Sequence, residues 1–184
     1  MKPANIIFLN GTSSAGKTSI AKALQDKLPV PYLHISGMGF LNLYNDRIWE
    51  EEQAFYHIRD CTMSGMHASV AVLARAGNPV ILDHILHIHG WLQELVELCD
   101  ELDVFFVGVM CPLEVAEQRE NQRTDRQSGT TREQRYQTHR HGLYDLEVDT
   151  SVLNVDECAD KIIEGLQEKP EKSAFEKLAI RFSG

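Results

Sequence analysis

Eight residues near the beginning of the chain have the types and the spacing of a phosphate-binding loop. Residues 11–18 read G-T-S-S-A-G-K-T and match the pattern G-x-x-x-x-G-K-[ST]. The two glycines allow backbone angles that direct successive N–H groups toward one anion, and the small residues between them let a phosphate approach the backbone. The lysine supplies positive charge for the β- and γ-phosphates, and the threonine hydroxyl can bind Mg²⁺. These residues therefore predict a site for a nucleoside triphosphate with Mg²⁺.

The sequence on either side of this loop supports the prediction. An apolar run at 5–10 is typical of a short buried strand, and residues 18–28 carry apolar side chains at helical spacing up to Pro29. A helix that begins at the loop directs the positive end of its dipole toward the phosphates. The alternative is a turn of small residues that binds no nucleotide, which this context disfavours. The predicted nucleotide contacts are Gly11, Thr12, Ser13, Ser14, Ala15, Gly16, Lys17, Thr18 and Ser19.

A second strand-like run places an acid where a metal-bound nucleotide needs one. Residues 79–83 read PVILD, so Asp83 falls at the carboxyl end of a predicted strand. Ligands of open parallel sheets bind at this edge, and a carboxylate there can hold the water shell of Mg²⁺. We therefore predict that Thr18 and Asp83 organise the metal. The alternative is that Asp83 caps the segment that follows it.

Arginines gather in residues 119–140 of an otherwise acidic chain. Arg119, Arg123 and Arg126 are spaced to share one face of a helix, and Arg132, Arg135 and Arg140 follow them. Such a cluster suits a lid that closes over a triphosphate and neutralises the charge that moves during transfer. The alternative is a solvated face that pairs with neighbouring acids. The predicted catalytic residues are Lys17, Asp83, Arg123 and Arg126.

Three histidines, His84, His87 and His89, follow the predicted strand directly. Their spacing matches no fixed pattern of metal ligands, so we interpret them as polar residues of a pocket or a loop. His84, His34 or Asp83 could serve the acceptor of a transferred group.

Strand-like and helix-like segments alternate along the chain, which predicts βαβ units and a parallel sheet. The strands are apolar throughout, as expected for a sheet that helices cover on both faces. We predict an α/β fold in one domain, 1–184, with a tail at 170–184 that forms a last helix or binds a partner. The predicted strands are 5–10, 32–35, 79–83, 103–111 and 145–149. The predicted helices are 18–28, 50–76, 91–99, a segment opened by Pro112, and 156–169.

The charge and the apolar runs of the chain disfavour several classes of partner. The formal net charge is −9 over 184 residues, which argues against nucleic acid or an anionic membrane as the main partner. The apolar runs, such as 104–110, are too short to span a bilayer. The first residues lead directly into the glycine loop, so we interpret them as part of the fold and not as a signal peptide. We expect a cytoplasmic protein that acts on a small molecule.

Several longer blocks of sequence resemble the chloramphenicol 3-O-phosphotransferase-like proteins, a branch of the P-loop small-molecule kinases. The most specific blocks are LDVFFVGVMCPLEVAEQRENQRTDRQSG at 102–129 and HGLYDLEVDTS at 141–151. Others are IIFLNGTSSAGKTS at the start, LPVPYLHISG at 28–37 and ARAGNPVILDH at 74–84. The resemblance implies a P-loop fold like that of shikimate and adenylate kinases, with a five-stranded parallel sheet. It also implies ATP-dependent transfer of phosphate to a hydroxyl of a small molecule.

One position departs from this family. In the antibiotic-modifying member a carboxylate just after the second strand acts as base for the acceptor hydroxyl, whereas Met38 stands at the matching position here. A thioether accepts no proton at neutral pH. A nucleotide-binding protein without turnover is therefore one alternative, and a nucleotide or nucleoside kinase is another. No N-K-x-D element for guanine is present, so ATP is the expected nucleotide. The residues predicted to face the acceptor are Ser36, Met38, His84, Arg47 and Arg59.

Overall fold

The computed structural model describes residues 4–49, 52–122 and 130–183. Five parallel strands form one sheet in the order β2-β3-β1-β4-β5. The predicted parallel sheet is confirmed, and each predicted strand overlaps an observed one. The strands are β1 (Ile6–Asn10), β2 (Leu33–Ser36), β3 (Val80–His84), β4 (Val104–Met110) and β5 (Leu146–Asp149).

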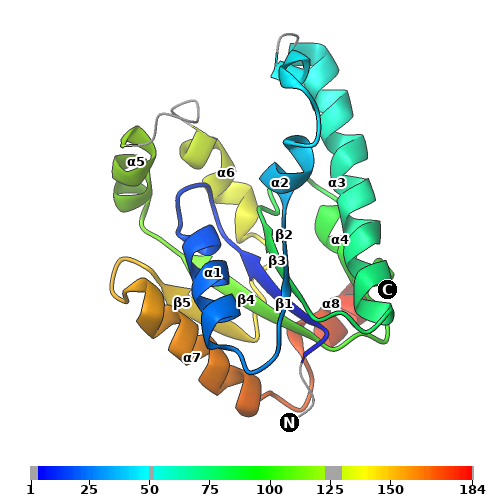
Figure 1. Ribbon diagram of the computed structural model, residues 1–184, viewed down its shortest axis with the longest axis vertical. Helices are drawn as coiled ribbons and strands as arrows, with labels where there is room; N and C mark the ends of the chain where they lie inside the picture. The colour runs from blue at the N-terminus through cyan, green and yellow to red at the C-terminus, as the bar shows by residue number, and fades with distance from the viewer. Residues whose placement is uncertain (1–3, 50–51, 123–129, 184) are drawn as a thin grey trace.

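Helices cover both faces of the sheet (Figure 1). α1 and α7 pack on one face, and α3, α4 and α8 pack on the other. The helices are α1 (Lys17–Lys27), α2 (Gly37–Leu41), α3 (Glu52–Arg75), α4 (Trp91–Leu98), α5 (Leu113–Asn121), α6 (Thr130–Thr138), α7 (Val155–Gln167) and α8 (Ala174–Phe182), with a short 3-10 helix, η1, at Asp46–Trp49.

The two helix layers explain why the strands are apolar along their whole length. Every residue of β1 and of β3 is buried, so successive side chains enter the core on one face and then on the other. Phe8 and Phe106 meet on the face that α3, α4 and α8 cover, with ring centroids 4.8 Å apart. Ile7 and Leu9 belong to the core on the opposite face.

The C-terminal tail forms a helix that packs into the core. Ser173 and Glu176 cap the first turn of α8 reciprocally, each side chain accepting a hydrogen bond from the other residue's backbone N–H. Phe175 then contacts Phe106 edge to face, with ring centroids 5.2 Å apart. Of the two possibilities for residues 170–184, the structure therefore shows a last helix of the fold.

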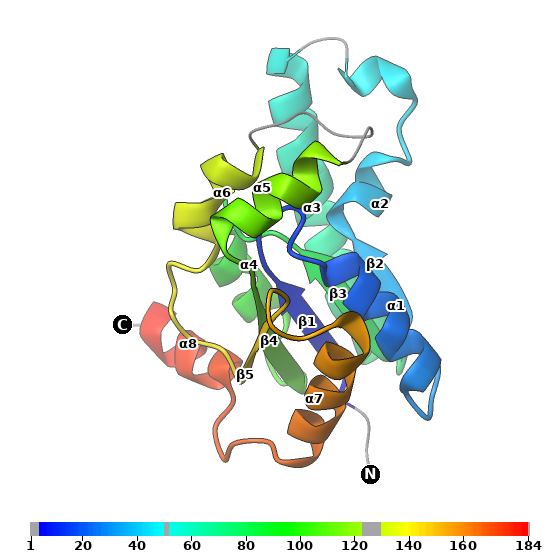
Figure 2. The ribbon, with the colours of Figure 1, turned by 90° about the vertical axis from the view of Figure 1, so that its left-hand side faces the viewer.

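Two groups of elements rise beyond the carboxyl ends of the strands (Figure 2). α2, η1 and the first turns of α3 stand on one side, and α5 and α6 stand on the other. Residues 11–16, between β1 and α1, lie between these groups. Within the described ranges, no helix is both long enough and apolar enough to cross a membrane.

Candidate active site

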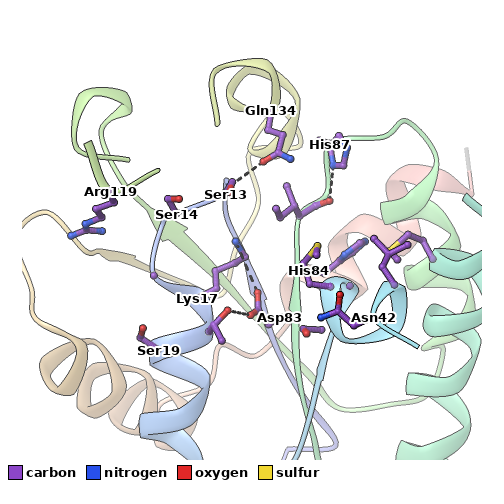
Figure 3. A pocket seen from close by; sticks show the side chains of 18 of the residues that line it. Ser13, Ser14, Lys17, Ser19, Asn42, Asp83, His84, His87, Arg119 and Gln134 are labelled. Atoms are coloured by element: carbon purple, nitrogen blue, oxygen red, sulfur yellow. Dashed lines mark hydrogen bonds and ion pairs between the residues drawn. The ribbon is translucent and has the colours of Figure 1, made fainter. Parts of the chain in front are cut away.

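A cleft of about 1530 Å³ opens at the carboxyl ends of the strands. Residues of the glycine loop lie in its middle (Figure 3). We call the two sides of the cleft the Arg119 end and the His84 end. The Arg119 end is lined by Arg119, Gln122, Thr150, Leu153, Asn154 and Val155. The His84 end is lined by Ser36, Gly37, Met38, Leu41, Asn42, Trp49, Phe55, Tyr56, Arg59, Met63, His84, Ile85, His87 and Trp91.

The two glycines of the loop are required for different reasons, space at Gly11 and backbone conformation at Gly16. A Cβ on Gly11 would lie 2.5 Å from the Val109 carbonyl oxygen, so any other residue would force β1 and β4 apart. Gly16 has φ of 95°, the left-handed region that favours glycine, and the first turn of α1 follows it. The loop thus turns tightly between β1 and α1 and points the N-terminus of α1 at the cleft.

Several polar groups of this loop have contacts within the protein. Lys17 Nζ donates to the Thr12 carbonyl at 2.7 Å, and the Ser13 N–H donates to Gln134 Oε1 at 2.9 Å. Ser14 Oγ is fully buried and has no hydrogen-bond partner among the residues that the structure describes. A buried hydroxyl without a partner is costly, and a phosphate oxygen is the kind of group that would satisfy it.

The other predicted loop contacts divide into buried and exposed residues. The small side chains of Thr12 and Ala15 are buried. Thr18 and Ser19 are exposed in the first turn of α1 and line the cleft. The loop therefore presents backbone groups, one ammonium and hydroxyls to the same space.

Asp83 lies opposite the loop, as the sequence predicts. It pairs in register with Leu9 of β1 and Ser36 of β2, which places it at the shared edge of three strands. Thr18 Oγ1 donates to Asp83 Oδ2 at 2.6 Å, and Lys17 Nζ lies 4.0 Å from Asp83 Oδ1. His34 Nε2 lies 3.7 Å from the same carboxylate.

These neighbours keep the buried carboxylate of Asp83 ionised. Burial alone would raise the pKa of Asp83, but His34, Lys17 and Thr18 together lower it below its ordinary value. The site thus holds a carboxylate and a hydroxyl in contact beside an ammonium. A carboxylate and a hydroxyl are oxygen ligands that suit Mg²⁺.

At the Arg119 end, the arginine supports the loop rather than projecting over it. Arg119 donates to Thr150 Oγ1 at 2.9 Å and to the Thr150 carbonyl at 2.7 Å. Thr150 Oγ1 in turn donates to the Ala15 carbonyl at 2.9 Å. Arg119 therefore connects α5 to the loop through the residue after β5.

The predicted arginine lid is described only in part. α5 ends at Asn121, before the other two arginines of the predicted helical face, and Arg123 and Arg126 lie outside the described residues. Arg132 on α6 is exposed and pairs with Glu117 of α5 at 2.8 Å, as the solvated alternative expects. The buried face of α6 contacts the loop through uncharged side chains instead. Its Thr131 Oγ1 donates to Glu120 Oε1 at 2.9 Å and lies 3.3 Å from the Ser13 carbonyl.

The residues predicted to face the acceptor are distributed between the cleft and the surface. Met38 lines the cleft, and Ser36 lines it while its Oγ accepts from the Gly39 N–H and caps α2. Arg59 lines the cleft beside aromatic rings, with its guanidinium 5.8 Å from the Trp91 ring and hydrogen-bonded to Asp60. Arg47 is exposed on η1 and does not line the cleft.

His84 belongs to a chain of hydrogen bonds that the sequence did not predict. His84 Nε2 lies 3.2 Å from His67 Nε2, and His67 Nδ1 lies 2.8 Å from Glu94 Oε2. Burial lowers the pKa of His84 well below its ordinary value. His87 lines the cleft nearby and His89 is exposed, as expected of pocket and loop residues. Among the described residues no group of three or more potential metal ligands is found.

Four residues of the site escaped the sequence prediction. Thr150 and Gln134 carry no motif, because a threonine after a strand and a glutamine in a helix are common on any surface. His67 falls on the apolar stripe of α3, where a buried histidine is the ordinary interpretation. Glu94 looks like any acid of an exposed helix. Only the packing of separate elements brings them to the site.

Comparison with known proteins assigns this geometry to a family. A family model for chloramphenicol phosphotransferase-like proteins matches residues 4–167. The chain belongs to this family. A Mycobacterium tuberculosis protein described as a candidate O-phosphotransferase is 31% identical over 204 residues, which cover 99% of the chain and 91% of that protein. The chain is thus a kinase-like phosphotransferase, and the predicted resemblance is confirmed.

Solved structures place this family member among the P-loop kinases by fold. The Mycobacterium tuberculosis APS kinase CysC, in complex with AMPPNP and APS, is 18% identical with a TM-score of 0.66, and the match covers 91% of this chain and 99% of that one. Shikimate kinase from Acinetobacter baumannii, in complex with shikimate, is 16% identical with a TM-score of 0.58 over 91% of this chain and 97% of that one. The family member therefore shares the kinase fold.

Proposed function

We propose that this chain transfers the γ-phosphate of ATP to a hydroxyl of a small organic molecule. The observation that carries the proposal is a single cleft that holds the phosphate loop, with the Thr18–Asp83 contact, and a separate end with several aromatic side chains in its wall. A donor triphosphate and an acceptor can meet in such a cleft at the loop. Phosphoryl transfer depends mainly on positioning and charge stabilisation, which this arrangement can supply.

The loop and Lys17 act on the donor. The backbone N–H groups of the loop and the Ser14 hydroxyl bind phosphate oxygens, and the Lys17 ammonium stabilises the charge that moves to the leaving group. Mg²⁺ would bind Thr18 Oγ1 and, through water, Asp83, where it would neutralise phosphate charge. Arg123 and Arg126 belong to this proposal as further positive charges over the transferring group.

The Arg119 end suits the base of the nucleotide. The guanidinium of Arg119 is planar and held at both edges by Thr150, so it can present a face to a purine ring. Leu153 and Val155 offer apolar contacts on the same side of the loop. None of these groups selects adenine strictly, so the preference for ATP remains part of the proposal.

The His84 end suits an acceptor with an apolar or aromatic body. Trp49, Phe55, Tyr56 and Trp91 line it, and Arg59 adds the positive charge of its guanidinium to this wall. Asp60 accepts hydrogen bonds from Arg59, which offsets part of that charge. A polyanionic acceptor is therefore disfavoured, and a hydroxylated compound with a sizeable apolar surface is favoured.

Product formation tests this proposal directly. The chain is incubated with Mg²⁺, ATP labelled at the γ-phosphate and a panel of hydroxylated compounds that includes chloramphenicol, and phosphorylated product is measured by mass spectrometry. Lys17→Met serves as the inactive control. Transfer to at least one compound by the parent, and none by the control, supports the proposal. Tight binding of ATP without any product would refute it.

A nucleotide-binding protein without turnover is the second candidate, favoured by Met38 in place of the family's carboxylate. The variant Met38→Asp distinguishes the two. If the variant phosphorylates a compound that the parent does not, the parent lacks a base. If the parent is active and the variant is no faster, the parent has a group that serves the acceptor without a carboxylate at residue 38.

A further inference from the structure

Three side chains from three elements form a hydrogen-bonded chain that ends at the cleft. Glu94 lies on α4, His67 on α3 and His84 at the end of β3. The nitrogen–oxygen distance between His67 and Glu94 is 2.8 Å, and the nitrogen–nitrogen distance between the two histidines is 3.2 Å. His67 is completely buried and His84 is 4% exposed, so these contacts are sheltered from bulk water.

Glu94 fixes the direction of one hydrogen bond, and the neutral state of the completely buried His67 ring fixes the other. A carboxylate only accepts, so His67 Nδ1 carries the hydrogen that points to Glu94. Burial lowers the pKa of His67, although Glu94 acts against this shift, so the ring is neutral and its Nε2 is an acceptor. His84 Nε2 must then donate to His67. A neutral imidazole has one hydrogen, so His84 Nδ1 carries a free lone pair.

This Nδ1 faces the cleft beside Gly37. It has no hydrogen-bond partner among the described residues, and it is not fully buried. A Cβ on Gly37 would lie 3.3 Å from it, so glycine at this position leaves the lone pair uncovered. Met38 follows Gly37 directly in the chain.

We infer that His84 Nδ1 binds the hydroxyl of the acceptor and takes its proton, and that His67 and Glu94 hold the imidazole in the required tautomer. This inference rests on the proposed function. The hydroxyl oxygen forms a bond to the γ-phosphorus as the bond to the β,γ-bridging oxygen breaks. ADP leaves with that electron pair, and the hydroxyl proton moves to Nδ1. His84 is thus a catalytic residue, and His67 and Glu94 are positioning residues, as in other base–orienter pairs.

The tautomer can be measured without any substrate. In the ligand-free chain labelled with ¹⁵N-histidine, NMR correlations report which ring nitrogen of each histidine carries hydrogen, and single histidine variants assign the signals. We expect hydrogen on His84 Nε2 and on His67 Nδ1. Hydrogen on His84 Nδ1 would overturn the inference. This measurement stands even if the chain transfers no phosphate, so it separates failure of the inference from failure of the proposed function.

Two substitutions of His84 test its contact with the acceptor. With the panel compound that the parent phosphorylates, His84→Gln should lower kcat by about 10²–10⁴ and leave ATP binding unchanged. The Gln amide reaches toward His67 but leaves the place of Nδ1 empty. His84→Asn puts an oxygen near that place and should recover part of the rate. An unchanged kcat in His84→Gln overturns the inference while the kinase activity stands.

The matched pair Glu94→Gln and Glu97→Gln tests the positioning role. Both residues lie on α4, but Glu97 is exposed, and its side chain accepts a hydrogen bond only from Gln93 among the described residues. An amide at residue 94 can donate as well as accept, so it permits the opposite tautomer. We expect Glu94→Gln to lower kcat and to show hydrogen on His84 Nδ1 by NMR, with Glu97→Gln like the parent. Parental tautomers and kcat in Glu94→Gln would overturn the positioning role.

Discussion

A double-mutant cycle on Lys17 and Asp83 tests how strongly the site is held together before any ligand binds. Their charged atoms are 4.0 Å apart, and both side chains are less than a tenth exposed. Asp83→Asn keeps an acceptor for the Thr18 hydroxyl but removes the negative charge. Lys17→Met removes the positive charge and keeps most of the volume. The double variant removes both.

The distance between the two charges also sets the expected coupling free energy. Two unit charges 4.0 Å apart attract by about 4 kcal/mol at an effective dielectric constant of about 20. Desolvation offsets part of this, so we expect a coupling free energy of about 2–3 kcal/mol. Lys169 and Asp103 form the control pair, because they are closer, at 2.7 Å, but their side chains are more exposed, at 29% and 46%. Exposed pairs contribute about 0–1 kcal/mol.

The assay is unfolding in urea at pH 7, with the free energy of unfolding extrapolated to water for the parent, the single variants and the double variant of each pair. Burial, and not distance, should decide the result, so the longer pair should couple more strongly than the shorter one. Equal coupling in the two cycles, or stronger coupling of Lys169 with Asp103, would refute the reasoning. It would mean that water reaches Asp83 and screens its charge.

Three other predictions concern two residues of the loop, Gly11 and Ser14, and two further histidines, His139 and His141. Gly11→Ala should lower the free energy of unfolding in urea by about 1–3 kcal/mol, because its Cβ would lie 2.5 Å from the Val109 carbonyl oxygen. An unchanged midpoint of urea unfolding would contradict this prediction. Ser14→Ala should stabilise the ligand-free chain, because it removes a buried hydroxyl that has no partner within the described ranges, yet it should weaken binding of a non-hydrolysable ATP analogue by roughly 1 kcal/mol. Thermal unfolding measures the first effect and calorimetry the second, and a loss or a gain in both would contradict the prediction. Burial lowers the pKa of His139 and of His141 to about 4 from 6.5 in the unfolded chain. Only the unfolded chain then binds these protons between pH 6.5 and about 4, so the free energy of unfolding should fall as the pH drops through this window, with a shallower fall in His139→Gln.

Much of the fold followed from the sequence because its signals are local. Continuous apolar runs marked buried parallel strands, and apolar spacing with Pro29 as a stop marked α1. The glycine loop was predictable for the same reason, since its conformation depends on its own small residues and on the adjoining strand and helix. Asp83 was predictable because the position of an acid at the end of a strand places it at the edge where ligands bind.

The remainder of the site could not be predicted because it depends on which side chains meet across elements. Arg119 looked like part of a lid, but its contact with Thr150 depends on how α5 packs beside the end of β5. His67 shares a helical face with Met63, Met66 and Val70, so its spacing indicated only the core. Its polar contacts arise because α4 and β3 bring an acid and a second histidine to that face.

The hydrogen bond from the Ser13 amide to Gln134 has a consequence for any affinity measured with this chain. Gln134 occupies, as an internal competitor, a donor that the proposed nucleotide requires. The apparent dissociation constant is then the intrinsic one divided by the fraction of molecules in which this amide is vacant. A substitution such as Gln134→Ala can therefore tighten nucleotide binding without adding a single contact to the nucleotide.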